Sequence, residues 1–207
     1  MDAHLRAGIA VYDAGRFHAA HDAWEDYWLE LDAGRDERFL HGLIQFTAVV
    51  HHGRTENWSG AQGLAESAGE YLAGLPADYR GVNLDDVRPF LARAAEDIEA
   101  VDWDHPPALR HHGETLDYEA LDFEATAVAA GVLAEAEGYD DGVVADAVDY
   151  ARDELDDRGE GRFVGLLFSF VREGEHRPVV YHRLRDHVER ERQKDDDVRG
   201  LFDERSG

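Results

Sequence analysis

Residues 18–28, which read HAAHDAWEDYW, contain side chains of the kinds that bind metal ions or transfer protons. His21 and Glu25 are four residues apart, so on a helix they share one face. An imidazole beside a carboxylate can bind a divalent metal ion, or the carboxylate can orient the imidazole as a general acid–base group. His21 and Glu25 are therefore the candidate catalytic residues.

A metal ion at this pair needs at least one further ligand from elsewhere in the chain. His41, His51 and His52 of the following predicted helix can offer it, and His52 completes the predicted metal set with His21 and Glu25. Histidine with carboxylate suits zinc, manganese or iron, so a divalent metal is a candidate cofactor, although the sequence leaves the cofactor unknown. The competing interpretation is a hydrogen-bonded His–Glu pair on a helix surface, with no metal.

Four more residues are predicted to line a polar pocket between the same two helices. Arg38 and Gln45 are seven residues apart and lie on one stripe of the second helix, while Trp24 and Trp28 flank the candidate pair on the first. If the helices pack antiparallel, the polar stripes converge and the tryptophans wall the pocket. In the alternative interpretation Gln45 is a buried amide that joins the helices, and both tryptophans belong to the core.

Several catalytic classes lack their motifs in this sequence. It contains no GxxxxGK[ST] loop, no GxGxxG fingerprint, no HExxH motif and no GxSxG elbow. It also contains no cysteine, which excludes disulfides, thiolate zinc sites and cysteine nucleophiles. Nucleotide-dependent and serine-hydrolase functions are therefore disfavoured, and whether the protein is an enzyme stays open.

The elements that must position these residues are helices, because apolar residues recur at spacings of three and four and strand-like alternation is nearly absent. We predict an all-α fold of about nine helices. Their expected ranges are 4–14, 16–31, 36–52, 58–73, 84–101, 122–137, 141–157, 161–173 and 178–193.

The predicted helices form two groups. The pattern Tyr12-x-x-Gly15-x-Phe17-x-x-Ala20 resembles the junction of a tetratricopeptide hairpin, so residues 1–105 are predicted to be an N-terminal helical-hairpin bundle. Pro106 and Pro107 interrupt the helices, and residues 106–207 are predicted to be a C-terminal helical extension with a charged tail. Its apolar faces can cover the first group or an external surface, so a homodimer or a protein partner is an alternative.

Acidic residues dominate the charge of the 207-residue chain. It has 46 Asp and Glu against 21 Lys and Arg, a formal net charge of −25, and Lys194 is the one lysine. Such a surface suits hydration in molar salt, so we expect a salt-adapted, halophilic protein. Binding to nucleic acid is disfavoured because phosphate contacts need basic residues. The sequence shows no membrane span and no signal-peptide pattern, so we expect a cytoplasmic protein.

One family resembles the first part of the chain. Ala20-His21-Asp22-x-Trp24-Glu25-x-x-Trp28, followed by Arg38 and Gly42-Leu43-Ile44-Gln45, resembles the pattern A-H-E-x-W-E-x-x-W … R … G-L-I-Q of domain of unknown function 309. The resemblance covers about residues 5–75, and loosely extends to about 100. Asp22 stands where that family usually has Glu, which keeps the charge but shortens the reach. The resemblance implies an all-helical fold and no established activity.

The sequence thus predicts a helical protein with a polar pocket formed by His21, Glu25, Arg38 and Gln45, whose chemistry is metal-dependent or acid–base. The alternative is a helical protein–protein interaction module without catalysis. In that case the same residues form a structural hydrogen-bond network.

Overall fold

The computed structural model describes residues 1–159 and 161–203, and their all-α architecture confirms the predicted fold class. Two short strands, β1 (Arg110–His111) and β2 (Glu114–Thr115), pair antiparallel in a hairpin that the sequence analysis did not predict. Over these residues the helices are α1 (Asp2–Asp13), α2 (Phe17–Trp28), α3 (Arg35–Arg54), α4 (Trp58–Leu72), α5 (Leu84–Glu96), α6 (Phe123–Glu137), α7 (Asp141–Arg158), α8 (Arg162–Arg172) and α9 (Arg177–Asp203).

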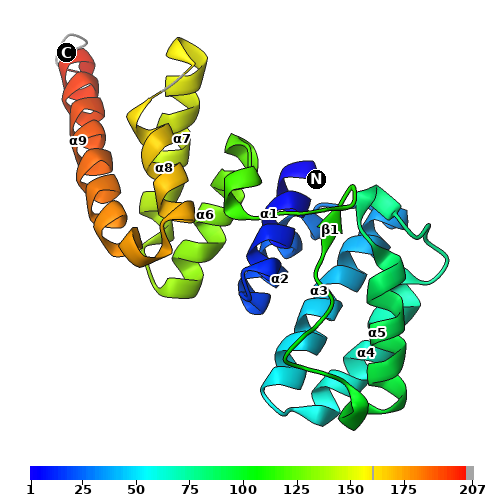
Figure 1. The fold of residues 1–207 in the computed structure, drawn as a ribbon. Coiled ribbons are helices and arrows are strands. Elements are labelled where there is room, and N and C mark those ends of the chain that lie inside the picture. The colour runs from blue at the N-terminus through cyan, green and yellow to red at the C-terminus, as the bar shows by residue number, and fades with distance from the viewer. Residues whose placement is uncertain (160, 204–207) are drawn as a thin grey trace. The chain divides into compact units, whose positions relative to one another are not determined.

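The chain forms two compact units, Met1–Val132 and Leu133–Gly207. In the first unit, successive helices from α1 to α5 pack against one another in chain order (Figure 1). The division between the two units lies within α6. The domain boundary that the sequence places near residue 105 stays a prediction. Among the residues that the structure describes, no helix combines the length and apolar character needed to cross a membrane.

The turn between α1 and α2 has the tetratricopeptide-like features that its sequence predicts. Gly15 adopts φ +78°, a left-handed conformation that glycine allows without steric cost. Tyr12 and Phe17 on either side of it pack edge to face, with ring centroids 5.1 Å apart. The two helices approach closely because Gly8 leaves room for Trp24, and a Cβ atom at Gly8 would lie 2.0 Å from the indole nitrogen.

Helix α3 is the centre of the first unit and packs against both α2 and α4. At Gly42 the α3 backbone comes close to α4, since a Cβ atom there would lie 2.5 Å from a methyl carbon of Leu72. Asn57 caps α4, with its side chain accepting a hydrogen bond from the Gly60 amide. The buried face of α3 includes Phe39, Leu43, Phe46 and Val50, which are all fully buried.

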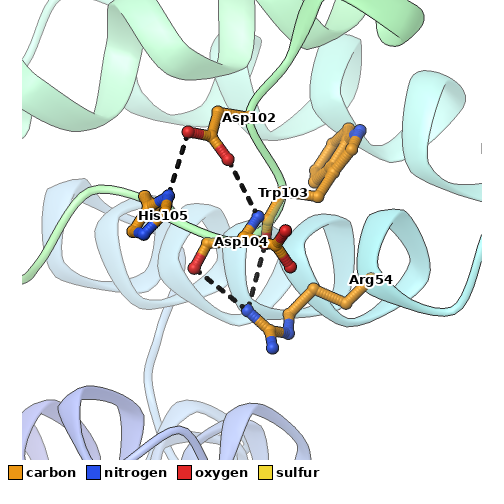
Figure 2. Close-up of polar contacts among 5 residues, drawn as sticks. All are labelled: Arg54, Asp102, Trp103, Asp104 and His105. Atoms are coloured by element: carbon orange, nitrogen blue, oxygen red, sulfur yellow. Dashed lines mark hydrogen bonds and ion pairs between the residues drawn. The ribbon is translucent and has the colours of Figure 1, made fainter.

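The irregular segment after α5 is fastened to the end of α3 (Figure 2). Arg54 donates hydrogen bonds to the carbonyl oxygens of Trp103, at 3.1 Å, and Asp104, at 3.3 Å. Within the segment, Asp102 accepts hydrogen bonds from the Asp104 amide and from His105 Nδ1, the latter at 3.0 Å. Residues 102–105 therefore have a defined course over the first unit although they lie outside the helices.

The second unit contains α7, α8 and α9, which pack against one another. The structure confirms the helices predicted there, and α9 continues to Asp203, beyond the predicted end near residue 193. Glu154 of α7 accepts hydrogen bonds from the amides of Arg162 and Phe163 at the start of α8. Arg177, the first residue of α9, donates to carbonyl oxygens in the last turn of α8. Two charged side chains thus close the two ends of α8.

Candidate functional site

Two ring contacts set the register of α2 against α3. The centroids of Trp28 and His41 are 4.5 Å apart, and those of His18 and His51 are 6.0 Å apart. Ten residues separate the two contacts on each helix, as antiparallel packing requires. Residues 18–28 therefore run along residues 41–51, and we call this contact line the α2–α3 seam.

Three residues of α2 on this seam have the spacing of metal ligands. His21, Asp22 and Glu25 each offer one ligand atom, and these atoms all lie within 4.8 Å of one another. His21 Nε2 and Glu25 Oε1 are 3.6 Å apart, which exceeds the roughly 2.7–3.2 Å of an N–H···O hydrogen bond. Nitrogen and oxygen ligands of one tetrahedral zinc ion lie about 3.4 Å apart, given bonds of about 2.1 Å. The pair is therefore spaced to share an ion better than to bond to each other.

The Asp22 carboxylate lies between two imidazoles. Burial raises its pKa, neighbouring His18 and His21 lower it, and Glu25 and Asp26 raise it. His18 Nδ1 lies 3.8 Å from Asp22 Oδ1, again beyond hydrogen-bond distance. A cation beside Asp22 would favour its ionised form and so oppose the effects of burial and of the two neighbouring carboxylates on its pKa.

Further histidines extend the seam toward the end of α3. The rings of His18 and His21 are 6.0 Å apart, and those of His51 and His52 are 5.8 Å apart. Burial, followed by His52 and His18, lowers the pKa of His51 and favours the neutral ring that binds metals. His52, the predicted third ligand, is in hydrogen-bond contact with Asn57, with 3.0 Å between its Nδ1 and the amide nitrogen.

At the other end of the seam lies a polar network that the sequence analysis largely missed. Trp28 donates a hydrogen bond of 3.0 Å to Glu37, and the ring of His41 lies between Trp28 and Tyr71. The Gln45 amide nitrogen is 3.1 Å from His41 Nε2. In the described part of the chain, His41 Nδ1 and Gln45 Oε1 are buried without a hydrogen-bond partner. The spacing of four between Glu37 and His41 is a sequence signal for part of this network. Tyr71 comes from α4, so no spacing within α3 could have indicated it.

The seam lies within the part of the chain that comparisons recognise. Residues 5–64 match the family described as a domain of unknown function (DUF309). The match confirms the resemblance seen in the motifs. An uncharacterized protein of Aquifex aeolicus (strain VF5) is 24% identical over 108 residues, which are 52% of this chain. The chain spans 32% of that relative's length. The DUF309 match thus includes most of α1, all of α2 and α3, and every residue of the seam.

Two conspicuous residues of the DUF309 motif lie away from the seam. Trp24 is fully buried, and its indole nitrogen donates a 3.4 Å hydrogen bond to the Leu5 carbonyl of α1. Arg38 donates to the carbonyl oxygens of Glu70, at 3.0 Å, and Ala73, at 3.4 Å, where α4 ends. Both residues join neighbouring helices. Of the four predicted binding residues, the structure therefore brings Trp28 and Gln45 to the seam.

A separate hollow in the first unit has a volume of about 370 Å³ and contains none of the predicted site residues. Burial raises the pKa of Asp13 at this hollow to about 6, although a 3.0 Å hydrogen bond from the Leu109 amide acts in the opposite direction. The hollow is lined by Ala10, Asp13, Ala14, Ala108, Thr115, Leu116, Asp117 and Tyr118.

Proposed function

We propose that this protein binds a divalent transition-metal ion through His21, Asp22 and Glu25 of α2. The observation that carries the proposal is the 3.6 Å between His21 Nε2 and Glu25 Oε1, together with an Asp22 oxygen in the same cluster. The three ligand atoms need only small side-chain rotations, since atoms on one ion are at most about 4.2 Å apart. Three protein ligands leave a coordination position for water or substrate, as in catalytic rather than structural sites.

A second His–carboxylate pair of the chain supports this interpretation by contrast. His105 Nδ1 and Asp102 Oδ2 are 3.0 Å apart, which is a hydrogen bond, and both side chains are exposed (Figure 2). His21 and Glu25 are more enclosed, with 27% and 44% of their side chains exposed, yet they are farther apart. The orienting hydrogen bond of an acid–base dyad has the 3.0 Å distance found at His105, whereas His21 and Glu25 are 3.6 Å apart.

The test is zinc binding by the full-length, untagged protein in molar KCl, measured by equilibrium dialysis and elemental analysis. The salt suppresses unspecific attraction of cations to the acidic surface. We expect His21→Ala and Glu25→Gln each to lower zinc affinity at least about tenfold, since even groups behind the ligands have effects of that size. His105→Ala is the matched control and should bind zinc as the wild type does.

Equal zinc affinity in the wild type, His21→Ala and Glu25→Gln would refute the proposal. A folded wild-type protein that binds no zinc, manganese or iron would also refute it. Either result would favour the alternative in which the seam is a structural network within a helical interaction module. Circular dichroism of each variant establishes that the fold is intact.

The charge supports a proposal about the setting of this site. With a net charge of −25, we infer a protein adapted to a salt-rich cytoplasm and without a nucleic-acid partner. Thermal stability that rises between 0.1 M and 2 M KCl would support salt adaptation, and stability that falls over this range would contradict it. Sedimentation at 2 M KCl tests whether the chain forms the homodimer that its sequence left as an alternative.

A further inference from the structure

We propose that the α2–α3 seam binds a second divalent ion through His18, His51 and Asp22, so that the Asp22 carboxylate bridges two ions. This inference rests on the proposed function, because the first ion is the one held by His21, Asp22 and Glu25. The second ion differs from the first because one of its ligands comes from α3, whereas all ligands of the first ion come from α2.

The histidine rings have the separation that a shared ion requires. The ring centroids of His18 and His51 are 6.0 Å apart, with planes tilted by 44°. With metal–nitrogen bonds of about 2.1 Å, two imidazoles on one ion have centroids about 5.3 Å apart at a tetrahedral angle and about 6.4 Å apart when opposed. The observed separation lies between these limits. His18 is 77% exposed, so its ring is free to complete the geometry.

The position of Asp22 makes it the bridge. Its Oδ1 lies 3.8 Å from His18 Nδ1, and the cluster that it forms with His21 and Glu25 spans no more than 4.8 Å. A carboxylate has two oxygens, and each can bind a different ion. Paired ions in proteins lie about 3.5–4 Å apart, which one carboxylate spans.

His51 rather than His52 is the ligand from α3. Consecutive residues of a helix point about 100° apart, so both cannot face α2 equally. His51 is the one whose ring lies near His18, whereas His52 is in hydrogen-bond contact with Asn57. His51 and His52 therefore form a matched pair of variants whose positions differ by about 100° around the axis of α3.

The experiment measures how many ions the full-length protein binds. Metal-free protein in molar KCl is titrated with Zn²⁺ against a chromophoric chelator, and separately with Mn²⁺ followed by electron paramagnetic resonance. We expect two equivalents of zinc for the wild type and for His52→Ala, and one equivalent for His51→Ala. Glu25→Gln should lose the other equivalent, and Asp22→Asn should abolish the exchange-coupled manganese signal of a bridged pair.

The outcomes separate the two proposals. One equivalent of zinc in the wild type, lost in Glu25→Gln and unchanged in His51→Ala, overturns the second ion and leaves the proposed function intact. Two equivalents that persist in His51→Ala, or that fall to one in His52→Ala instead, overturn the assignment of His51. No binding by the wild type overturns both. Circular dichroism identifies any variant that fails to fold, and His51→Gln then replaces His51→Ala.

Discussion

Arg177 should be the residue on which the stability of the second unit depends most strongly. Its side chain is almost entirely buried, at 3% exposure, and it forms an ion pair with Glu137 at the end of α6. It also donates hydrogen bonds to the carbonyl oxygens of Phe170, at 2.8 Å, and Val171, at 3.2 Å. Arg177→Met keeps an unbranched apolar stem at this position but removes the guanidinium group and every one of these bonds.

The expected loss follows from what the substitution leaves behind. Removing one partner of a buried ion pair costs about 3–5 kcal/mol, because the remaining charge loses its counter-charge. Two carbonyl groups in the last turn of α8 lose their donor as well, and a helix end buried without partners is unfavourable. Because these effects overlap, we expect a total loss of about 3–5 kcal/mol in the free energy of unfolding of this unit.

Arg192→Met is the matched control, because Arg192 pairs with Asp146 in the same unit at 46% and 39% exposure. An exposed pair contributes about 0–1 kcal/mol, so this variant should be close to the wild type. Urea unfolding in 2 M KCl, followed by circular dichroism, gives both free energies. All four tryptophans lie in the first unit, so their fluorescence reports separately on that unit.

Equal losses in Arg177→Met and Arg192→Met would refute the argument from burial. The double variant Arg177→Met/Glu137→Gln provides a further check, since neutralising Glu137 should recover part of the loss. A double variant that is less stable than Arg177→Met alone would show that the carbonyl groups, not the carboxylate of Glu137, set the loss of stability.

Three further predictions concern other contacts. Gly53→Ala should lower the free energy of unfolding by about 1–3 kcal/mol, because the new Cβ would lie 2.0 Å from a ring carbon of Trp103. Displacement of that ring should also red-shift the tryptophan emission, and an unshifted spectrum would contradict this prediction. Asp13 has its pKa raised to about 6, so ionisation costs stability as pH rises from about 4 to 6. Asp13→Asn should therefore raise the melting temperature at pH 7.5 and have little effect at pH 4, and equal effects at both would disprove it. Glu154→Ala should lower the free energy of unfolding by about 0.5–2 kcal/mol, because the amides at the start of α8, including that of Phe163, lose their acceptor. Urea unfolding measures this loss, and an unchanged stability would count against the capping role of Glu154.

Most of the fold could be predicted because helical periodicity is a local property of the sequence. Apolar residues at spacings of three and four placed the helices, and the left-handed Gly15 marked the first turn. The β hairpin around residues 110–115 was missed because strands of two residues have no periodicity to detect. The extension of α9 was missed because the charged residues that follow position 193 were interpreted as a tail.

The site could be predicted only as far as one helix determines it. The spacing of His21 and Glu25 placed them together without knowledge of any other helix. The choice between His51 and His52 depends on the rotational phase of α3 against α2, which packing sets and a spacing rule leaves open. Trp24 shows the same limit, because its place in the core depends on the room left by Gly8 of α1.

The overall charge and the seam pose different electrostatic problems. Molar salt reduces the Debye length to about 3 Å, so it relieves repulsion among the many acidic groups spread over the surface. The ligand atoms of His21, Asp22 and Glu25 lie within 4.8 Å of one another and are partly buried, which leaves little room for mobile ions between them. The proposed salt adaptation would account for the net charge of −25 but not for the crowding of Asp22 and Glu25. The proposed cation would account for that crowding directly, which makes the stoichiometry of zinc the decisive test of the seam.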